Sequence, residues 1–308
     1  MGVICSFGDA PGSPVVDKKT CSVCGACADI CPVGVLAKGA EAIQVDNAVA
    51  FGCIARGHCM MVCPTGAVTV TGRRLSPHDL VDLPSKGDLA TPEQLEALLL
   101  SRRSIRRFKQ EEVSRELLDR VVAAAANAPM GIPPWNVGVV VFQGREKVRE
   151  LAGDAAGLYA RMLKLVDNPV GSLILRPFMK KATYEQWVSF ILPLGRDIVK
   201  EREAGRDVML YDAPTALLFH ASPYADAADA FIPCTYAMIA AHALGLGTTM
   251  IGCLAPPLAR NKNHLRKYGI PEGHQPKIVL ILGHPAVHFQ KAIRRPLHSV
   301  RYYEKALG

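Results

Sequence analysis

The chain has 308 residues, a formal net charge of +8, and a composition of 49% hydrophobic and 21% charged residues. These values are ordinary for a globular protein and exclude extensive disorder, and the length allows one large domain or two. The basic residues form short clusters without interleaved aromatic residues, so we expect no nucleic-acid partner.

The first part of the chain is rich in cysteine. Seven of the ten cysteines lie between Cys21 and Cys63. Residues 21–32, CSVCGACADICP, have the C-x2-C-x2-C-x3-C-P spacing of bacterial iron–sulfur sites, in which three cysteines hold one cubane and the fourth binds the other. This clustered spacing favours metal binding over disulfide bonds.

The cysteine motif is repeated at an offset of 32 residues, as CIARGHCMMVCP at residues 53–64. Each cysteine of the first motif has a counterpart except Cys24, whose place is taken by Arg56. Residues 17–71 resemble a bacterial ferredoxin-like domain with two [4Fe-4S] clusters. The crossed ligation of that family implies a cluster I held by Cys21, Cys24, Cys27 and Cys63. It implies a cluster II, one thiolate short, held by Cys31, Cys53 and Cys59.

Three interpretations of the missing ligand are open. In the first, the second cluster is a [3Fe-4S] cluster. In the second, it is a [4Fe-4S] cluster whose odd iron binds hydroxide, a remote thiolate such as Cys5, or another side chain. In the third, the cluster is lost and the loop only folds. Arg56 is a poor ligand, because a guanidinium group stays protonated and offers no lone pair. We expect its positive charge to favour the reduced state of an anionic cluster nearby.

Beyond Val70 the chain is polar and rich in proline and glycine, which is typical of a linker. We therefore expect a domain boundary near Ser85. The predicted domains are a ferredoxin-like iron–sulfur domain with its linker over residues 1–85 and a second domain over residues 86–308.

The second domain is predicted to begin with a capped helix. Thr91 suits the N-cap, Pro92 the first helical position, and Gln94 the capping-box position. The helix leads into a basic turn at residues 101–108, where guanidinium and hydroxyl groups suit a phosphate, with a solvated basic surface as the alternative. The residues concerned are Arg102, Arg103 and Ser104.

A second helix and a strand are expected next. Leucine and valine recur at helical spacing within residues 114–134, and the helix should end at Pro129 and Gly131. Residues 135–142, WNVGVVVF, predict an apolar strand.

Several motifs in order resemble the FMN-dependent nitroreductase family over residues 91–308: RRS, AP.G, YDAPTALLFHAS, ALGLGTTMIG, KIVLILGHP and a closing RRP. A subgroup of that family carries an attached ferredoxin-like domain. The resemblance implies an α+β fold, a mixed sheet flanked by helices, with FMN as cofactor at the subunit interface of a homodimer.

The resemblance also implies which residues bind FMN. The phosphate and ribityl chain would be held by Arg102, Arg103 and Ser104, with Lys291 and Arg294 on the C-terminal side. The isoalloxazine ring would lie along Pro129, Met130 and Gly131, and its N5 edge would face Thr249, Met250, Ile251 and Gly252. One departure is GIPPWN at residues 131–136, which replaces an asparagine-containing element of many members. Either backbone groups or Asn136 would then contact the flavin pyrimidine.

A long segment at residues 157–211 has helical stretches with exposed-looking aromatic residues. It is interpreted as a lid over the flavin or as extra packing between subunits. The aromatic residues are Tyr159, Phe178, Tyr184, Trp187 and Phe190. Cys253 is interpreted as a small buried hydrophobic residue rather than a redox thiol, and the histidines predict no zinc site.

Residues 231–259 contain no acidic or basic side chain apart from histidine and are long enough to span a bilayer. Pro233 and the glycines at 245 and 247 interrupt this stretch, so we expect a buried helix of about 12 residues and no integral membrane segment. The N-terminus lacks a charged region followed by an apolar stretch, so we expect no signal peptide and a cytoplasmic location.

Together these features predict an FMN-dependent oxidoreductase of the nitroreductase or ene-reductase type. It would take electrons from a ferredoxin-like or other low-potential donor, pass them singly through iron–sulfur clusters to FMN, and reduce a small electrophilic organic substrate. The leading substrates are nitroaromatics and activated alkenes. No G-x-G-x-x-G is present, so a Rossmann NAD site is not supported, although the family can use NAD(P)H without it.

Two alternatives share these features: a non-catalytic electron-transfer module or redox sensor, and a dehalogenating or oxidative flavoenzyme of the same fold. Fold alone does not choose among them. The sequence identifies no catalytic proton donor, and the candidates considered are Tyr184 and Cys253.

Overall fold

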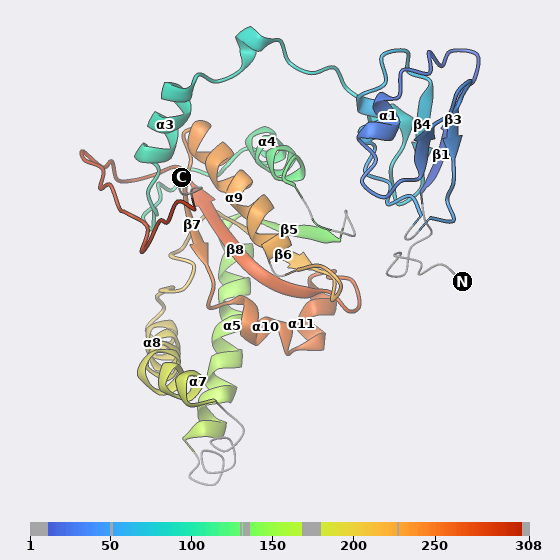
Figure 1. Ribbon diagram of the computed structural model, residues 1–308. Coiled ribbons are helices and arrows are strands. Elements are labelled where there is room, and N and C mark those ends of the chain that lie inside the picture. The colour runs from blue at the N-terminus through green and yellow to red at the C-terminus, as the bar shows by residue number, and fades with distance from the viewer. Residues whose placement is uncertain are drawn as a thin grey trace.

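The computed structural model describes residues 12–49, 52–129, 131, 136–167, 180–226 and 228–303 (Figure 1). One hydrophobic core cluster is confined to the cysteine-rich part, from Val16 to Leu75. Two further clusters are built from Phe108 onwards. The predicted boundary near Ser85 falls between these cores, in a segment that contributes to none of them.

The cysteine-rich part is a small antiparallel unit built on the internal repeat. β1 (Ser13–Val16) pairs with β4 (Val68–Thr71), and β2 (Leu36–Lys38) pairs with β3 (Ile43–Val45), a pair that lies between β1 and β4 in the sequence. One short helix follows in each repeat, α1 (Ala26–Asp29) and α2 (His58–Met61).

The linker contains two single-turn 3-10 helices, η1 (Pro77–Asp79) and η2 (Lys86–Asp88). Ser76 caps η1, because its hydroxyl accepts a hydrogen bond from the His78 N–H at 3.2 Å. The segment in Figure 1 that arches from the cysteine-rich unit to α3 is this linker. Its apolar side chains are exposed, as expected for a segment outside a core.

The larger part is built around a four-stranded sheet in the order β5-β6-β8-β7. The strands are β5 (Val137–Gln143), β6 (Thr215–Ala221), β8 (Gln275–Gly283) and β7 (Gly247–Ile251). All three pairings are antiparallel, and Ser104 adds a parallel bridge to Thr248 on the β7 edge. β6 is buried along its whole length, because both faces of the sheet are covered.

Helices cover the two faces of this sheet. On one face, α4 (Arg115–Ala126) and α9 (Ala228–Ala243) pack against Leu217 and Phe219 of β6. On the other face, α5 (Arg145–Val166), α8 (Leu192–Glu203) and α10 (Ala255–Ala259) pack against Ala216 and Leu218. The α+β architecture with a helix-flanked sheet was predicted and is confirmed.

The apolar stretch at 231–259 forms α9 and β7, as a buried core segment. α9 has 16 residues and begins at Ala228, earlier than predicted, with Pro233 inside it. Pro233 is the sixth residue of α9, where it removes one backbone hydrogen bond of the helix. Across the described ranges, no helix combines the length and the hydropathy needed to cross a membrane.

The predicted helix α3 (Pro92–Ser101) and its capping box are confirmed. The Gln94 N–H donates to the Thr91 hydroxyl at 3.2 Å, and the Thr91 N–H donates to Gln94 Oε1 at 3.0 Å. α3 has no buried residue, and its leucines are about half exposed. From His284 to Tyr303 the chain has no helix or strand and is mostly exposed.

The segment at 157–211 is mostly helical over its described residues as far as Glu203, and the residues after Glu203 form turns and bends. α5 is followed by α7 (Lys181–Gln186), a π-helical turn η4 (Trp187–Ile191) and α8. A further helix outside this segment, α11 (Lys262–Lys267), lies between α10 and β8. Figure 1 shows α7 and α8 beside the distal half of α5. Tyr159, expected to be exposed, is 3% exposed because it faces the core shared by α5 and α8, and Phe178 lies outside the described residues.

Candidate functional site

The basic turn after α3 is attached to β7 by two hydrogen bonds. The Ile105 N–H donates to the Thr248 carbonyl oxygen at 2.9 Å, and the Thr249 hydroxyl donates to the Ile105 carbonyl oxygen at 2.6 Å. Ile105 itself is buried. The structure therefore brings Ser104 next to the strand that carries the predicted residues Thr249 to Gly252.

Two arginines in this turn carry unbalanced charge. Burial and the neighbouring charge of Arg103 lower the pKa of Arg102. Arg103 Nη1 donates to the Arg102 carbonyl oxygen at 2.6 Å, but Arg103 Nη2 is buried with no hydrogen-bond partner among the described residues. A buried guanidinium donor without an acceptor fits a bound anion, and its planar fork suits a phosphate.

His242, at the end of α9, joins this group, although no role was predicted for it. Its Nε2 lies 2.9 Å from the Ser101 hydroxyl. Burial and the charge of Arg102 lower the pKa of His242. The neutral imidazole thus adds no positive charge to the pair of arginines at neutral pH.

A cavity of about 620 Å³ opens at the C-terminal end of β7. Its lining includes the predicted residues Met250, Ile251 and Gly252, followed by Cys253. The rest of the lining consists of aliphatic, aromatic and basic side chains, and no described acidic residue contributes to it. The aromatic and basic side chains are Arg106, Tyr159, Trp187, Phe190, Tyr211 and Arg260.

The predicted lid contributes Trp187 and Phe190 to this cavity. Tyr184 is half-buried and does not line it. Tyr159 lines the cavity while its hydroxyl donates to the Cys253 carbonyl oxygen at 2.8 Å, and burial raises the pKa of Cys253. Cys253 is therefore a protonated thiol beside the cavity at neutral pH.

The turn after α4 is held by an acidic residue that was not among the predicted site residues. Asp229 is 7% exposed, and its carboxylate accepts hydrogen bonds from the Gly131 N–H at 2.9 Å and the Asp226 N–H at 3.2 Å. A Cβ atom on Gly131 would lie 3.0 Å from this carboxylate, so the close approach requires glycine. Pro129 is exposed, and Met130 lies outside the described residues.

Two of the predicted phosphate ligands form no hydrogen bond with the basic turn among the described residues. Lys291 and Arg294 are exposed on the C-terminal segment, and neither has a hydrogen bond or ion pair with any described residue. The Asn136 carbonyl oxygen accepts from the Ser222 N–H at 2.9 Å, at the start of β5.

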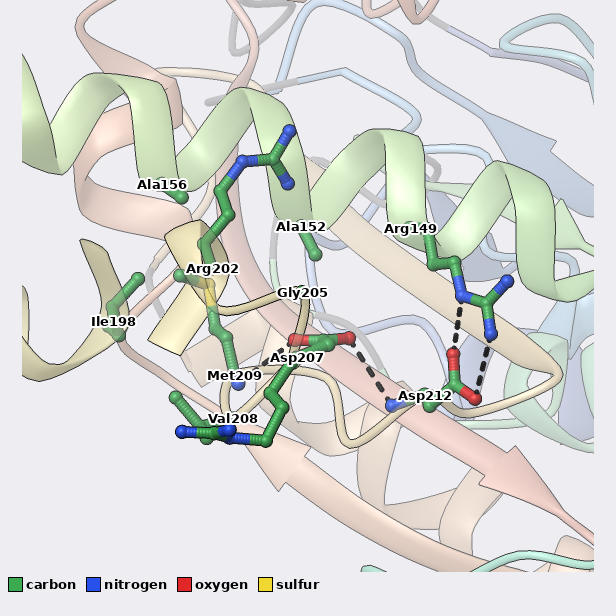
Figure 2. Close-up of a pocket in the computed structure, with 11 residues that line it drawn as sticks. Arg149, Ala152, Ala156, Ile198, Arg202, Gly205, Asp207, Val208, Met209 and Asp212 are labelled. Atoms are coloured by element: carbon green, nitrogen blue, oxygen red, sulfur yellow. Dashed lines mark hydrogen bonds and ion pairs between the residues drawn. The ribbon is translucent and has the colours of Figure 1, made fainter. Parts of the chain in front are cut away.

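An ion-pair network lies beside a second cavity of about 570 Å³ (Figure 2). Arg149 is bound to Asp212 through two contacts of 2.6 and 3.0 Å. Asp207 caps the same loop by accepting from the Leu210 N–H at 2.9 Å. In Figure 2 the Arg149 and Asp212 side chains face each other across the space between α5 and this loop.

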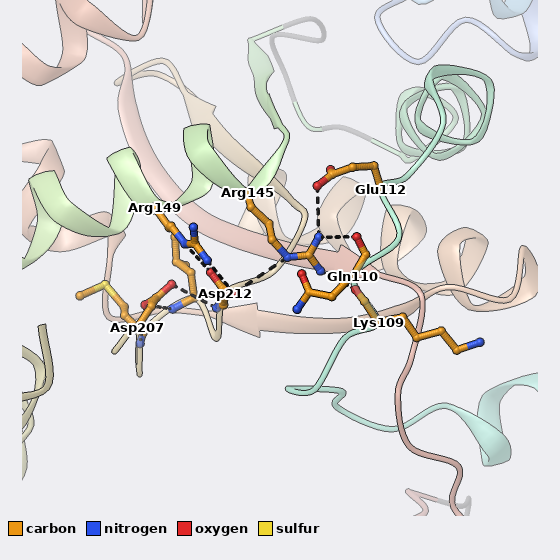
Figure 3. Close-up of polar contacts among 9 residues, drawn as sticks. Lys109, Gln110, Glu112, Arg145, Arg149, Asp207 and Asp212 are labelled. Atoms are coloured by element: carbon orange, nitrogen blue, oxygen red, sulfur yellow. Dashed lines mark hydrogen bonds and ion pairs between the residues drawn. The ribbon is translucent and has the colours of Figure 1, made fainter. Parts of the chain in front are cut away.

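Arg145 connects this loop to residues 109–112, which follow the basic turn (Figure 3). Its Nη1 donates to Glu112 at 3.1 Å and to the Gln110 carbonyl oxygen at 3.0 Å, and its Nε lies 3.9 Å from Asp212. Tyr211 and Asp212 have left-handed backbone angles, φ 56° and 52°. The network therefore fixes a strained loop that places Tyr211 under Arg106, 5.6 Å from ring centre to guanidinium carbon.

Several cysteines lie within electrostatic range of other cysteines of their predicted sets. Burial raises the pKa of Cys27, and repulsion by Cys63 and Cys21 adds to the effect. Burial raises the pKa of Cys59 to about 11, with repulsion by Cys53 and Cys31 in addition. Cys27 and Cys59 therefore each lie near two members of their own predicted set. Cys24 is exposed, and Cys5 lies outside the described residues.

The backbone repeats its unusual conformations in the two motifs. Left-handed φ angles occur in pairs at equivalent places: Val23 and Ala55, both 53°, Gly25 and Gly57 at 91° and 75°, and Gly34 and Gly66 at 71° and 65°. The loop that lacks one cysteine keeps the conformation of the complete loop. No three described side chains converge on one metal ion, and a cubane does not need this because its thiolates bind different irons.

Comparison with known proteins assigns both parts of the chain. A model described as the nitroreductase family matches residues 99–284, more than half of the chain. The chain belongs to the nitroreductase family. A model described as a 4Fe-4S dicluster domain matches residues 13–64 of this nitroreductase, so both resemblances predicted from the sequence are confirmed.

Relatives outside the iron–sulfur part are distant. The nitroreductase is 27% identical over 211 residues to a Bacillus subtilis (strain 168) protein named FMN reductase (NAD(P)H), covering 68% of this chain and 73% of that one. A nitroreductase with bound FMN from Bacteroides fragilis NCTC 9343 has a TM-score of 0.51 at 19% identity, over 68% and 99% of the chains. An FMN-dependent nitroreductase from Clostridium difficile R20291 has a TM-score of 0.50 at 21% identity, over 69% and 100%. The solved structures establish the fold alone.

Proposed function

We propose that this nitroreductase is an iron–sulfur flavoprotein that reduces a small electrophilic organic substrate with electrons delivered through its N-terminal clusters. The observation that carries the proposal is the pair Arg102 and Arg103, of which Arg103 has a buried donor without a described acceptor. The turn that carries this pair is attached to β7, and a cavity lies at the C-terminal end of that strand. This arrangement supports a phosphate-bearing cofactor whose ring reaches the cavity.

The cofactor is proposed to be FMN. Its phosphate and ribityl chain would be held by Arg102, Arg103 and Ser104, with Lys291 and Arg294 supplied by the C-terminal segment. Its ring would lie against Pro129, Met130 and Gly131 and against Thr249, Met250, Ile251 and Gly252. When bound, FMN supplies the conversion between single-electron and paired-electron transfer. Asp229 supports this site by holding the Gly131 backbone in place.

The cavity lining indicates the class of substrate. Aromatic side chains such as Trp187 and Tyr211 suit a flat conjugated molecule, and Arg106 suits the oxygen atoms of a nitro or carbonyl group. Since no described acidic residue lines the cavity, an electron-poor or anionic compound meets no repulsion there. Nitroaromatics and activated alkenes therefore stay the leading substrates.

The iron–sulfur part is proposed to hold cluster I on Cys21, Cys24, Cys27 and Cys63 and cluster II on Cys31, Cys53 and Cys59. The repeated loop conformation supports a retained second cluster over an abandoned site. Its type, [4Fe-4S] or [3Fe-4S], is left to spectroscopy. A ferredoxin-like or other low-potential donor would reduce this domain, which we place at residues 1–85, ahead of the FMN domain at 86–308.

A second copy of the chain is the proposed partner in a homodimer. The C-terminal segment exposes Phe289, Leu297 and Tyr303 at 59%, 77% and 106%, and α3 exposes Leu95 and Leu99 at 47% and 48%. Apolar side chains that a single chain leaves uncovered support an extended subunit interface. The predicted cytoplasmic location stays a prediction.

The test is anaerobic. Protein reconstituted with iron, sulfide and FMN is reduced with dithionite, and flavin reoxidation is followed by stopped-flow absorbance with a nitroaromatic, an enone or no acceptor. Rapid reoxidation with product formation supports the reductase. Equal, slow reoxidation under all conditions would instead support the electron-transfer module or redox sensor, and release of halide from a haloaromatic would support the dehalogenating alternative.

A further inference from the structure

A tight turn follows β4 and carries two consecutive arginines in an unfavourable conformation. The Leu75 N–H donates to the Gly72 carbonyl oxygen at 2.9 Å, and Arg73 and Arg74 between them have φ angles of 49° and 68°. Turns of this kind favour glycine or asparagine, because a side chain is strained in the left-handed region. Two arginines at these positions therefore need an explanation beyond turn formation.

The turn lies on the loop of the second cysteine motif. Leu75 packs with Met60 in the N-terminal core, and a Cβ atom on Gly57 would lie 3.2 Å from Leu75 Cδ2. On the other side of the loop, the Gly12 N–H donates to the Cys53 carbonyl oxygen at 2.7 Å. The turn thus covers the part of the motif in which a cysteine is missing.

The two arginines differ sharply in their surroundings. Arg73 is 8% exposed, whereas Arg74 is exposed. Burial raises the pKa of Cys53 and the charge of Cys31 adds to this, while the charge of Arg73 lowers it. Gly12, which is bridged to Cys53, precedes Ser13, and Ser13 pairs with Thr71, two residues before Arg73. The turn therefore lies beside Cys53, and the Arg73 guanidinium is within electrostatic range of this ligand of the second cluster.

Arg56, whose positive charge was predicted to favour the reduced state of the second cluster, is less suited than Arg73 to do so. Arg56 is only half-buried, whereas Arg73 is 8% exposed. A charge that keeps contact with solvent is screened, whereas a charge in a low-dielectric interior acts strongly over the same distance. The buried cation beside the incomplete site is Arg73.

We propose that Arg73 sets the reduction potential of the second cluster by placing a buried positive charge beside Cys53. This inference rests on the proposed presence of a cluster at Cys31, Cys53 and Cys59. One electron from a reduced mediator dye adds one negative charge to the cluster, and a nearby cation stabilises that charge more than it stabilises the oxidised state. Arg73 thereby makes the site with fewer thiolates easier to reduce.

The experiment is a mediated redox titration of the full-length, anaerobically reconstituted protein, monitored by EPR. In Arg73→Gln, the equilibrium constant for uptake of one electron by the second cluster should fall about tenfold, which is about 59 mV to more negative potential. Arg74→Gln is the matched control, since it removes the same charge from the same strained turn. It and Arg56→Gln should change the constant less than threefold.

Arg73→Lys separates charge from structure. If charge is the cause, this variant keeps the wild-type potential even where Arg73→Gln loses iron. A tenfold fall in Arg73→Lys, an unchanged constant in Arg73→Gln, a larger effect of Arg56→Gln, or iron loss in both Arg73 variants would each overturn the inference. About four irons per chain in the wild-type protein would instead reject the second cluster itself, and with it that part of the proposed function.

Discussion

The basic turn that carries Arg102 and Arg103 depends on a buried hydroxyl. Thr249 is 2% exposed, and its Oγ1 donates to the Ile105 carbonyl oxygen at 2.6 Å, from a strand far away in the sequence. Thr249→Val keeps the shape of the side chain and removes the donor. The Ile105 oxygen then loses a buried partner, for which we expect a loss of about 1–3 kcal/mol in the free energy of unfolding.

The neighbouring threonine provides an internal control of opposite sign. Thr248 is 1% exposed, and its hydroxyl has no hydrogen-bond partner among the described residues. Replacing a buried, unpartnered hydroxyl by a methyl group removes a desolvation penalty, so Thr248→Val should be neutral or stabilising by about 1 kcal/mol. Thr249→Ser keeps the donor and should lie closer to the wild-type protein than Thr249→Val does.

The assay is thermal unfolding of FMN-depleted protein, followed by circular dichroism, with FMN affinity measured by fluorescence quenching. For a domain of this size, 1 kcal/mol corresponds to about 2–4 °C in Tm. We expect Thr249→Val to lower Tm and to weaken FMN binding, because the turn that would hold the phosphate is no longer fixed to β7. Equal losses in Thr248→Val and Thr249→Val, or an FMN affinity unchanged by Thr249→Val, would refute the reasoning.

Three further predictions concern the phosphate site, the histidine pair and the clusters. Arg103→Ala should weaken FMN binding at least tenfold, about 1.4 kcal/mol, whereas Arg107→Ala, exposed in the same turn, should change it little; equilibrium dialysis compares the two. Burial and the nearby charge of His274 lower the pKa of His220 to about 4, so the unfolded chain binds more protons below its ordinary pKa of about 6.5. Stability should therefore fall as pH drops from about 6.5 to about 4, and urea titrations should show a smaller fall in His220→Gln. Removal of iron with a chelator should unfold the cysteine-rich unit but leave the Tm of the larger part unchanged, because the two have separate cores; a shared transition would contradict this.

Short-range patterns in the sequence predicted much of this protein correctly. The ligand spacing from Cys21 to Cys63 belongs to a local motif, and its repetition carries over directly into paired backbone conformations. The capping box at Thr91 and the apolar run that becomes α9 are likewise local, because helix caps and burial patterns depend on residues within a few turns. Family resemblance added the flavin site, whose residues stay a proposal.

The tertiary structure decided the features that depend on distant pairs. Asp229 meets Gly131, and Thr249 meets Ile105, only because packing of α9 and β7 on the sheet brings separate segments together. The same holds for Arg73, which in the sequence is one of two adjacent arginines and in the structure is the buried one beside Cys53. No local pattern distinguishes Arg73 from Arg74, since burial and electrostatic range are properties of the folded chain and not of its neighbours in sequence.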